Sequence, residues 1–196
     1  MMNWLLKHWY NATIFLAIYT TVLLVMYVSK QNFALFLIWL QTPVYFMHEF
    51  EEYILPGGFK SFFNTKIMGS QNSQFPLTDK VSFWINVPVI FIAMPVSAIL
   101  ATYFGLGWGI WTAAFSVLNA AAHVAWFFKF KYNPGLVVSV LLNIPVGCYA
   151  IWYFIQHQLV TTPVWIISII FGVMVQVVMT AYGFVVLKPK VAQVKP

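Results

Sequence analysis

Charged residues are scarce in this chain of 196 residues. They make up 7% of the sequence, whereas hydrophobic residues make up 62%, and the mean hydropathy is +0.83. Soluble globular domains carry about 25% charged residues, so this composition excludes a water-exposed surface over the whole molecule. Aromatic residues reach 19%, which suits a bilayer because Trp and Tyr collect at the headgroup level. The composition predicts an integral membrane protein.

Arginine is absent, and cysteine occurs once, at Cys148. A single Cys excludes an intrachain disulfide and leaves the redox compartment open. The net charge of +6 comes from Lys residues that flank apolar runs singly or in pairs. This pattern is typical of membrane topology signals rather than of a basic binding face, so we expect no nucleic-acid partner.

Apolar runs of transmembrane length divide the chain, since a bilayer core needs about 20 apolar residues per helix. We predict an all-α fold, a polytopic membrane bundle of six transmembrane helices in a single domain covering residues 1–196. The predicted helices lie at residues 10–29, 33–55, 81–103, 106–128, 134–156 and 163–187. The first run is not followed by a small-residue cleavage site, so we expect a retained helix rather than a signal peptide.

The Lys residues predict the orientation of such a bundle. If six helices cross in alternation, both termini and the loops 56–80 and 129–133 share one side. That side carries nine of the ten Lys residues, and the other side carries only Lys30. The positive-inside rule then places both termini in the cytoplasm. Two interpretations of loop 56–80 stay open: a partly helical segment on the membrane surface, or an ordinary loop.

Three of the four acidic residues lie together in the predicted helix 33–55. Glu49, Glu51 and Glu52 follow His48, and His48, Glu51 and Glu52 share about a 100° arc of that helix, with Glu49 just outside it. A charge near the centre of a membrane helix costs roughly 2.5–3.5 kcal/mol. Every Lys lies at a helix end or in a loop, so these carboxylates need protonation, pairing, water or a metal ion.

His123 is the basic side chain expected to meet this cluster. It lies about as far from the cytoplasmic end of its helix as His48 does from the end of helix 33–55. Other helices place polar side chains at comparable depth. The candidates on these helices include Asn86, Asn119, Ser139, Asn143, Gln176 and Thr180, and Tyr45 continues the stripe of His48 along helix 33–55. We predict one polar cavity that opens towards the cytoplasm.

Residues 48–53, His-Glu-Phe-Glu-Glu-Tyr, resemble the signature of the HXXEE family of bacterial integral membrane proteins. Asn119 with His123 four positions later, and the step Tyr132-Asn133-Pro134-Gly135, are also similar to that family. The resemblance spans roughly residues 35–150. It implies an integral protein of the bacterial cytoplasmic membrane. The family has no settled biochemical function, so the resemblance points to a site rather than to an activity.

A metal site is the leading interpretation of the cluster. His48, Glu52 and His123 would bind a divalent metal ion, because two His and one carboxylate form a catalytic zinc set. Iron and manganese are the alternatives. Glu51 and Glu52 are the predicted catalytic carboxylates, either acting as a general base towards water. The residues expected to orient the ligands or to contact substrate are Glu49, Asn86, Asn119, Tyr45, Tyr132 and Asn143.

These residues lead to three hypotheses for function. The first is a membrane-embedded, metal-dependent enzyme, hydrolase-like, acting on a lipid or membrane-bound substrate from the cytoplasmic leaflet. The second is a proton-coupled transporter or channel with a Glu/His relay. The third is a non-catalytic protein that binds a ligand or lipid. Membrane lipids are the expected partners, and the sequence does not indicate an oligomeric state.

Overall fold

The computed structural model describes residues 1–193, and these residues form helices without any β-strand. The all-α prediction is therefore confirmed for the described chain. The elements in chain order are α1 (Met2–His8), η1 (Trp9–Ala12), α2 (Thr13–Leu23), η2 (Leu24–Val28), α3 (Phe33–Tyr53), α4 (Phe59–Phe62), η3 (Phe63–Ile67), α5 (Asp79–Asn86), η4 (Val87–Ala93), α6 (Met94–Phe104), η5 (Leu106–Trp108), α7 (Trp111–Phe130), α8 (Leu136–Val138), η6 (Ser139–Asn143), α9 (Ile144–Gln156), α10 (Thr162–Ala181), η7 (Tyr182–Leu187) and α11 (Lys188–Gln193).

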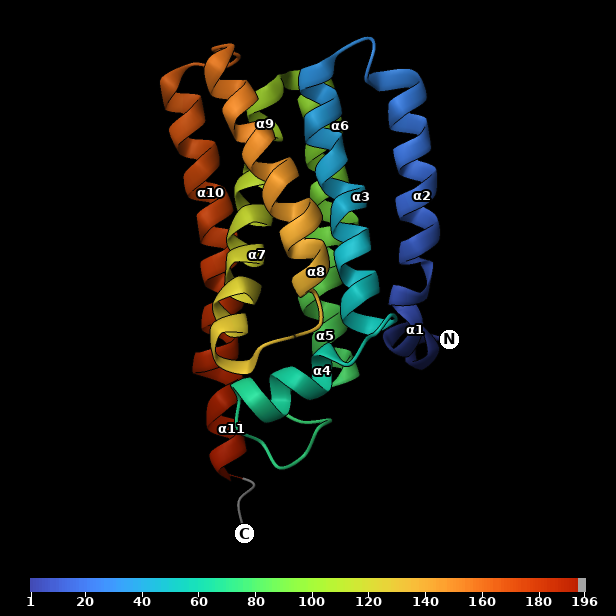
Figure 1. Cartoon of the computed structure of the whole chain (residues 1–196), viewed down its shortest axis with the longest axis vertical. Helices are drawn as coiled ribbons and strands as arrows, with labels where there is room; N and C mark the ends of the chain where they lie inside the picture. The colour runs from blue at the N-terminus through green and yellow to red at the C-terminus, as the bar shows by residue number, and fades with distance from the viewer. Residues whose placement is uncertain (194–196) are drawn as a thin grey trace.

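The elements join into long columns that run up and down the bundle in alternation (Figure 1). The connections α2–α3 and α9–α10 lie at one end, and α1, α4 and α11 lie at the other. Several columns contain a short stretch of π-helix, and Pro88 lies within η4. A proline has no N–H and cannot complete the regular ladder, so such a local widening lets the column continue past it.

Length and composition qualify five of these columns as membrane spans, not the predicted six. The five are Met2–Val28, Asp79–Phe104, Leu106–Phe130, Leu136–Gln156 and Thr162–Gln193. They indicate an integral membrane protein. The predicted helix 33–55 exists as α3, with 21 residues, but the polar and acidic residues in its second half lower its hydropathy. The prediction of six apolar spans was wrong at this helix for that reason.

Helix α3 is the central element of the bundle. It packs against α2, α6, α7 and α9, and its polar residues Gln41, His48 and Glu52 are all buried. The apolar windows of the columns around it are 11–50% buried within the protein, with the last column lowest at 11%. Polar side chains are costly against lipid, so the helix that carries them occupies the interior.

Two helix boundaries differ from the sequence-based expectation. The first column begins at Met2 rather than at residue 10, and the last continues to Gln193 rather than ending at 187. The first extension mixes apolar residues with Asn3, Lys7 and His8, and the second contains Lys188 and Lys190. Lys195, which entered the prediction of orientation, lies outside the described residues.

Loop 56–80 is partly helical, with α4 and η3 forming its first half. Asn64 holds the second half against it. Its Nδ2 donates to the carbonyl oxygens of Ser73 and Leu77, and its Oδ1 accepts from Leu77 N at 2.7 Å. Lys60 pairs with Asp79 at the start of α5. These contacts fold the loop back onto the end of the bundle beneath α3 and α7 (Figure 1).

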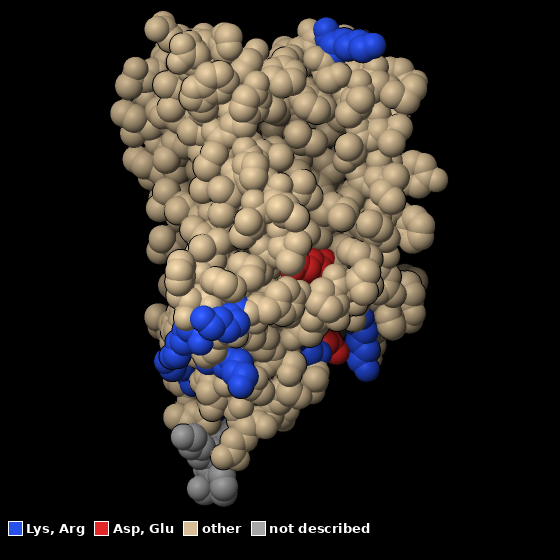
Figure 2. All heavy atoms as spheres, viewed as in Figure 1, with Lys and Arg blue, Asp and Glu red and all other residues tan. Residues whose placement is uncertain are grey.

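The Lys side chains are distributed unevenly between the two ends of the molecule. Figure 2 shows basic atoms at the upper end and a larger group of them at the lower end, with acidic atoms at one place on the face between. Lys30 lies in the α2–α3 connection, whereas Lys60, Lys66 and Lys80 lie in or beside loop 56–80. The rest of the face between the two ends is the part of the surface that suits lipid.

Replacing Gly172 with Leu should destabilise the contact between α7 and α10. A Cβ at Gly172 would lie 2.6 Å from the Trp111 carbonyl oxygen, so a side chain there forces the two backbones apart. We expect the detergent-solubilised variant to lose helical circular dichroism at a temperature lower by about 5 °C or more. Val173→Leu, on the exposed side of the same helix, is the matched control. Equal melting temperatures for the two variants would contradict this packing role.

Candidate metal site

Three ligand-type side chains converge between α3 and α7. His48 and Glu52 stand one turn apart on α3, and His123 comes from α7. Glu52 Oε1 lies 3.4 Å from His48 Nε2 and 3.3 Å from His123 Nε2. One ligand atom from each residue lies within 4.8 Å of the others, and all three side chains are buried. This group could hold a metal ion.

The spacing of these atoms suits coordination better than direct pairing. Zinc binds N and O ligands at about 2.0–2.2 Å, and tetrahedral angles then separate neighbouring ligand atoms by about 3.3–3.6 Å. A charge-assisted N–H···O hydrogen bond would bring nitrogen and oxygen to about 2.7–2.9 Å. The distances of 3.4 Å to His48 and 3.3 Å to His123 fall in the first range.

Asn133 determines which ring nitrogen of His123 faces Glu52. Its Nδ2 donates to the His123 carbonyl oxygen at 3.0 Å, which orients the amide. Its Oδ1 therefore accepts from His123 Nδ1 at 2.7 Å. A neutral imidazole has one N–H, so the Nε2 that faces Glu52 presents a lone pair. A lone pair directed at a carboxylate oxygen is repulsive unless a proton or a metal ion lies between them.

The turn from α7 to α8 also packs against both imidazole rings. Ser139 Oγ lies 3.5 Å from His48 Nδ1, on the far side of the ring from Glu52. Gly135 leaves the space that the rings occupy, since a Cβ there would lie 2.6 Å from His123 Cε1 and 2.9 Å from His48 Cε1. Its φ of +95° is itself favourable only for glycine. This turn therefore positions the rings from outside the site.

Glu51 points away from this group, although it is adjacent to Glu52. Its Oε1 accepts from Val137 N at 3.1 Å and its Oε2 from Val138 N at 2.7 Å, at the first turn of α8. The Tyr132 hydroxyl donates to Oε1 at 3.1 Å. Partial burial and then the Glu51 carboxylate raise the pKa of Tyr132 above its usual value, so the hydroxyl keeps its proton. A carboxylate at a helix N-terminus is stabilised by the free N–H groups there.

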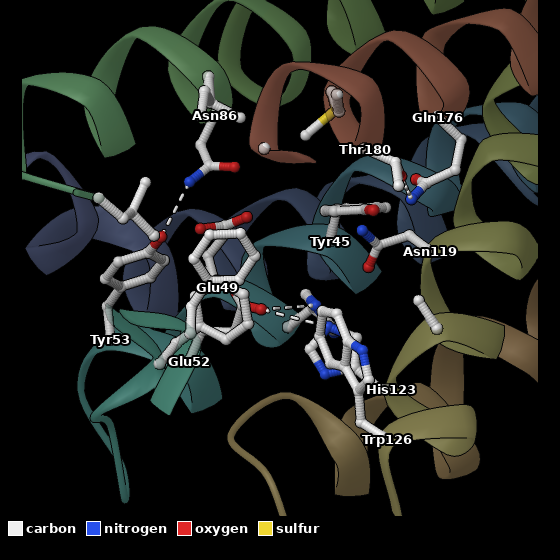
Figure 3. A pocket seen from close by; sticks show the side chains of 18 of the residues that line it. Tyr45, Glu49, Glu52, Tyr53, Asn86, Asn119, His123, Trp126, Gln176 and Thr180 are labelled. Atoms are coloured by element: carbon white, nitrogen blue, oxygen red, sulfur yellow. Dashed lines mark hydrogen bonds and ion pairs between the residues drawn. The ribbon is translucent and has the colours of Figure 1, made fainter. Parts of the chain in front are cut away.

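A cavity of about 260 Å³ lies beside the three converging side chains (Figure 3). Glu52 points towards His123 at one side of it, and Tyr45, Asn119 and Gln176 gather at another. Glu49 also lines the cavity and is 1% exposed. Phe59, which follows two glycines of positive φ at 57 and 58, brings an aromatic ring from α4 into the lining. The wall opposite α3 and α7 comes from α5, α10 and η7.

The remaining predicted residues divide between the cavity and other places. Tyr45, Asn86 and Asn119 line the cavity, where Asn86 Nδ2 donates to the Tyr53 hydroxyl at 3.0 Å. Tyr132 is held at Glu51, outside the cavity lining. Asn143 donates to Ser116 Oγ at 3.0 Å between η6 and α7. The structure thus brings together His48, Glu52 and His123, whereas it separates Glu51, Tyr132 and Asn143 from them.

Sequence reasoning named Asn133, Gly135 and Ser139 but missed that these three residues orient the imidazoles. It assigned that task to Asn86 or Asn119, because both lie at the expected depth on long helices. The orienting residues instead come from the α7–α8 turn and the start of the next helix. The Asn-Pro-Gly step within that turn was the available signal, since it marks a tight return of the chain towards His123.

The fold and the site together define a class of protein: a membrane helix bundle with a buried His/Glu/His group beside a cavity. A family model described as "Protein of unknown function with HXXEE motif" matches residues 39–150, more than half of the chain. The chain belongs to the HXXEE family, and the resemblance read from residues 48–53 is confirmed. No curated protein and no solved structure matches it.

Replacing Asn133 with Ala should weaken zinc binding at this site by about 10–100-fold, as loss of a partner that orients a ligating His usually does. The reason is that His123 loses the acceptor that keeps its Nε2 directed at Glu52. Competition against a fluorescent zinc chelator measures the affinity. Asn143→Ala is the control, because that amide bonds Ser116 and should leave zinc affinity unchanged. Equal affinities in both variants would exclude an orienting role for Asn133.

Proposed function

We propose that this protein is a membrane-embedded, metal-dependent hydrolase whose substrate is a lipid or another membrane-bound molecule entering from the cytoplasmic leaflet. His48, Glu52 and His123 hold the metal ion. The two imidazoles and one carboxylate make a donor set with room for a further ligand on the cavity side. This is the arrangement of catalytic rather than structural zinc sites, which leave a coordination position open.

The observation that carries the proposal is the orientation of His123. Its Nδ1 is occupied by Asn133 Oδ1, so the Nε2 lone pair and Glu52 Oε1 face each other at 3.3 Å. A divalent cation between these atoms removes the repulsion and satisfies the two ring nitrogens and the carboxylate together. Zinc fits this set best, and iron and manganese are the alternatives for mixed imidazole and carboxylate ligands.

A bound metal ion would supply Lewis acidity and lower the pKa of water at the site. Glu51 does not face the metal ligands, because Val137 N, Val138 N and the Tyr132 hydroxyl hold its carboxylate at the start of α8. The Glu52 carboxylate lies between the imidazole rings of His48 and His123. The carboxylate that faces the cavity without a hydrogen-bond partner for its Oε2 is Glu49.

The distribution of the Lys residues and the position of loop 56–80 support the cytoplasmic leaflet as the side from which the substrate enters. The end of the bundle that carries α1, α4 and α11 also carries nearly all basic side chains (Figures 1 and 2). The positive-inside rule makes this the cytoplasmic end, with both termini there and α3 crossing as a sixth, internal helix. Phe59 and Phe63 from that end line the cavity, so the cavity lies nearer to the cytoplasmic leaflet.

A shared proton is the alternative occupant of the space between Glu52 and the rings. Such a Glu/His group would suit a proton relay in a transporter. The distances of 3.3 and 3.4 Å favour the metal, because a proton shared between charged partners would draw the atoms closer. Metal content decides between the two occupants.

Purified wild-type protein should contain about one zinc, iron or manganese ion per chain, as a three-ligand catalytic site does. His48→Ala and His123→Ala should contain almost none, because each loses one of the converging nitrogens. Inductively coupled plasma mass spectrometry measures the content. His157→Ala is the control, since this exposed residue at the end of α9 lies outside the cavity lining. Metal-free wild-type protein, or variants with wild-type content, would disprove the metal site.

The hydrolase itself is tested on a mixture of natural substrates. Wild-type protein in liposomes of total bacterial lipid should release a cleavage product that mass spectrometry detects in the lipid extract. His123→Ala, reconstituted at equal protein content, should release none, because the bound metal supplies the main part of the rate. If the metal-loaded wild type and His123→Ala give the same lipid profile, hydrolysis of a membrane lipid is the wrong reaction.

A further inference from the structure

The cavity combines two glutamate side chains with buried polar atoms that lack a hydrogen-bond partner among the described residues. Its lining, among the residues that the structure describes, includes the carboxylates Glu49 and Glu52 and no Lys. Glu49 and Tyr45 are each 1% exposed, yet Glu49 Oε2 and the Tyr45 hydroxyl have no hydrogen-bond partner in the described chain. Buried polar atoms in folded proteins are nearly always hydrogen-bonded, so these two atoms indicate a ligand.

The unpartnered atoms come from more than one wall of the cavity. Tyr45 and Glu49 are four residues apart on α3 and share a face of it. Asn119 Oδ1 from α7 and Gln176 Oε1 from α10 line the same space and also have no hydrogen-bond partner among residues 1–193. Figure 3 shows Tyr45, Asn119 and Gln176 close together on one side of the cavity. A ligand group that reaches this side meets oxygens from three helices.

Aromatic rings form the other part of the lining. The Phe59 ring contacts His123, Tyr53 and Trp126, with ring centroids 5.7, 6.2 and 6.2 Å away. Aromatic faces attract organic cations, and a nearby carboxylate adds to that attraction. Without a metal ion at the neighbouring His48–Glu52–His123 group, a phosphate or carboxylate ligand would instead face Glu49 with no Lys in the described lining to offset the repulsion.

The size and position of the cavity limit the ligand further. A volume of 260 Å³ equals about nine water-sized groups at about 30 Å³ each. That is enough for a headgroup and a few methylene groups, but not for a whole two-chain lipid. Phe184, which is 44% exposed, belongs to the wall formed by α10 and η7. The cavity therefore reaches the lipid-facing surface there.

We propose that the cavity binds the ammonium group of a single-chain amphiphile. Glu49 is the counter-ion of the ammonium group, Tyr45 accepts a hydrogen bond from it, and the chain leaves past Phe184 into the bilayer. The inference rests on the proposed function in taking this cavity as the substrate site, and it adds the chemical class of the substrate. An amine, rather than a phosphate, is then the group that distinguishes this substrate from ordinary membrane lipids.

Three water-soluble probes test the charge preference: hexylamine, hexanol and hexanoate, which share a six-carbon chain. Isothermal titration calorimetry measures their binding to the full chain in phosphatidylcholine nanodiscs, with empty nanodiscs as the blank. A chelator is present, so hexanoate cannot bind through a metal ion. Hexylamine is protonated at pH 7, and we expect it to bind about tenfold more tightly than hexanol. Equal affinities, or tighter binding of hexanoate, would overturn the proposal.

Glu49→Gln should lower the affinity for hexylamine about tenfold while leaving hexanol within about twofold, because it removes charge but little volume. Asp79→Asn is the control: it also removes one carboxylate, but from the pair with Lys60 outside the cavity lining, and should change neither affinity. Thermal unfolding of each variant verifies the fold. If Glu49→Gln binds hexylamine as wild type does, Glu49 is not the counter-ion and the proposal fails.

This experiment and the metal analysis can fail separately. A protein without metal that still prefers hexylamine retains the amine site and loses the metal-dependent activity. A protein with stoichiometric metal and no preference for hexylamine retains the metal centre and loses the proposed substrate class.

Discussion

Burying ionisable groups between membrane helices is the constraint on which the rest of this structure depends. A carboxylate in a low-dielectric interior is tolerated only when its charge is paired or its oxygens are hydrogen-bonded. Glu52 lies between two imidazole nitrogens, and Glu51 accepts from two backbone N–H groups and Tyr132. Glu49 faces a cavity. Glu52 and Glu51 are thus satisfied in different ways, whereas Glu49 Oε2 has no hydrogen-bond partner among the described residues.

The position of α3 follows from that constraint. The helix that carries the acidic cluster must keep it from lipid, and it does so by occupying the centre, with apolar helices around it. The same central position brings His48 and Glu52 within reach of α7, and Glu51 within reach of the start of α8. The two adjacent glutamates of the HXXEE motif therefore serve different neighbours, since consecutive residues on a helix point about 100° apart.

The α7–α8 turn is the second element on which the site depends. Asn133 accepts a hydrogen bond from the His123 ring and donates one to the His123 carbonyl oxygen. Gly135 provides the space in which both imidazoles pack. Glu51 holds the first turn of α8 in place from α3. One acidic residue thus stabilises the turn that positions the ligands of its neighbour. This linkage gives Glu51 a structural purpose within the motif, even though it lies away from the cavity.

Hydropathy and charge in the sequence were enough to determine the helical class, most helix positions and the meeting of His48 and Glu52 with His123, because periodicity and depth along a helix are local properties. Hydropathy alone could not predict that α3 lies in the interior of the bundle, since the exposure of a helix depends on which helices surround it. The hydrogen-bond partners of Glu51 and Asn133 were decided only by the tertiary structure. Their partners come from residues 133–138 and from other helices, and no one-dimensional pattern records the direction in which a side chain meets a distant backbone N–H or an empty cavity.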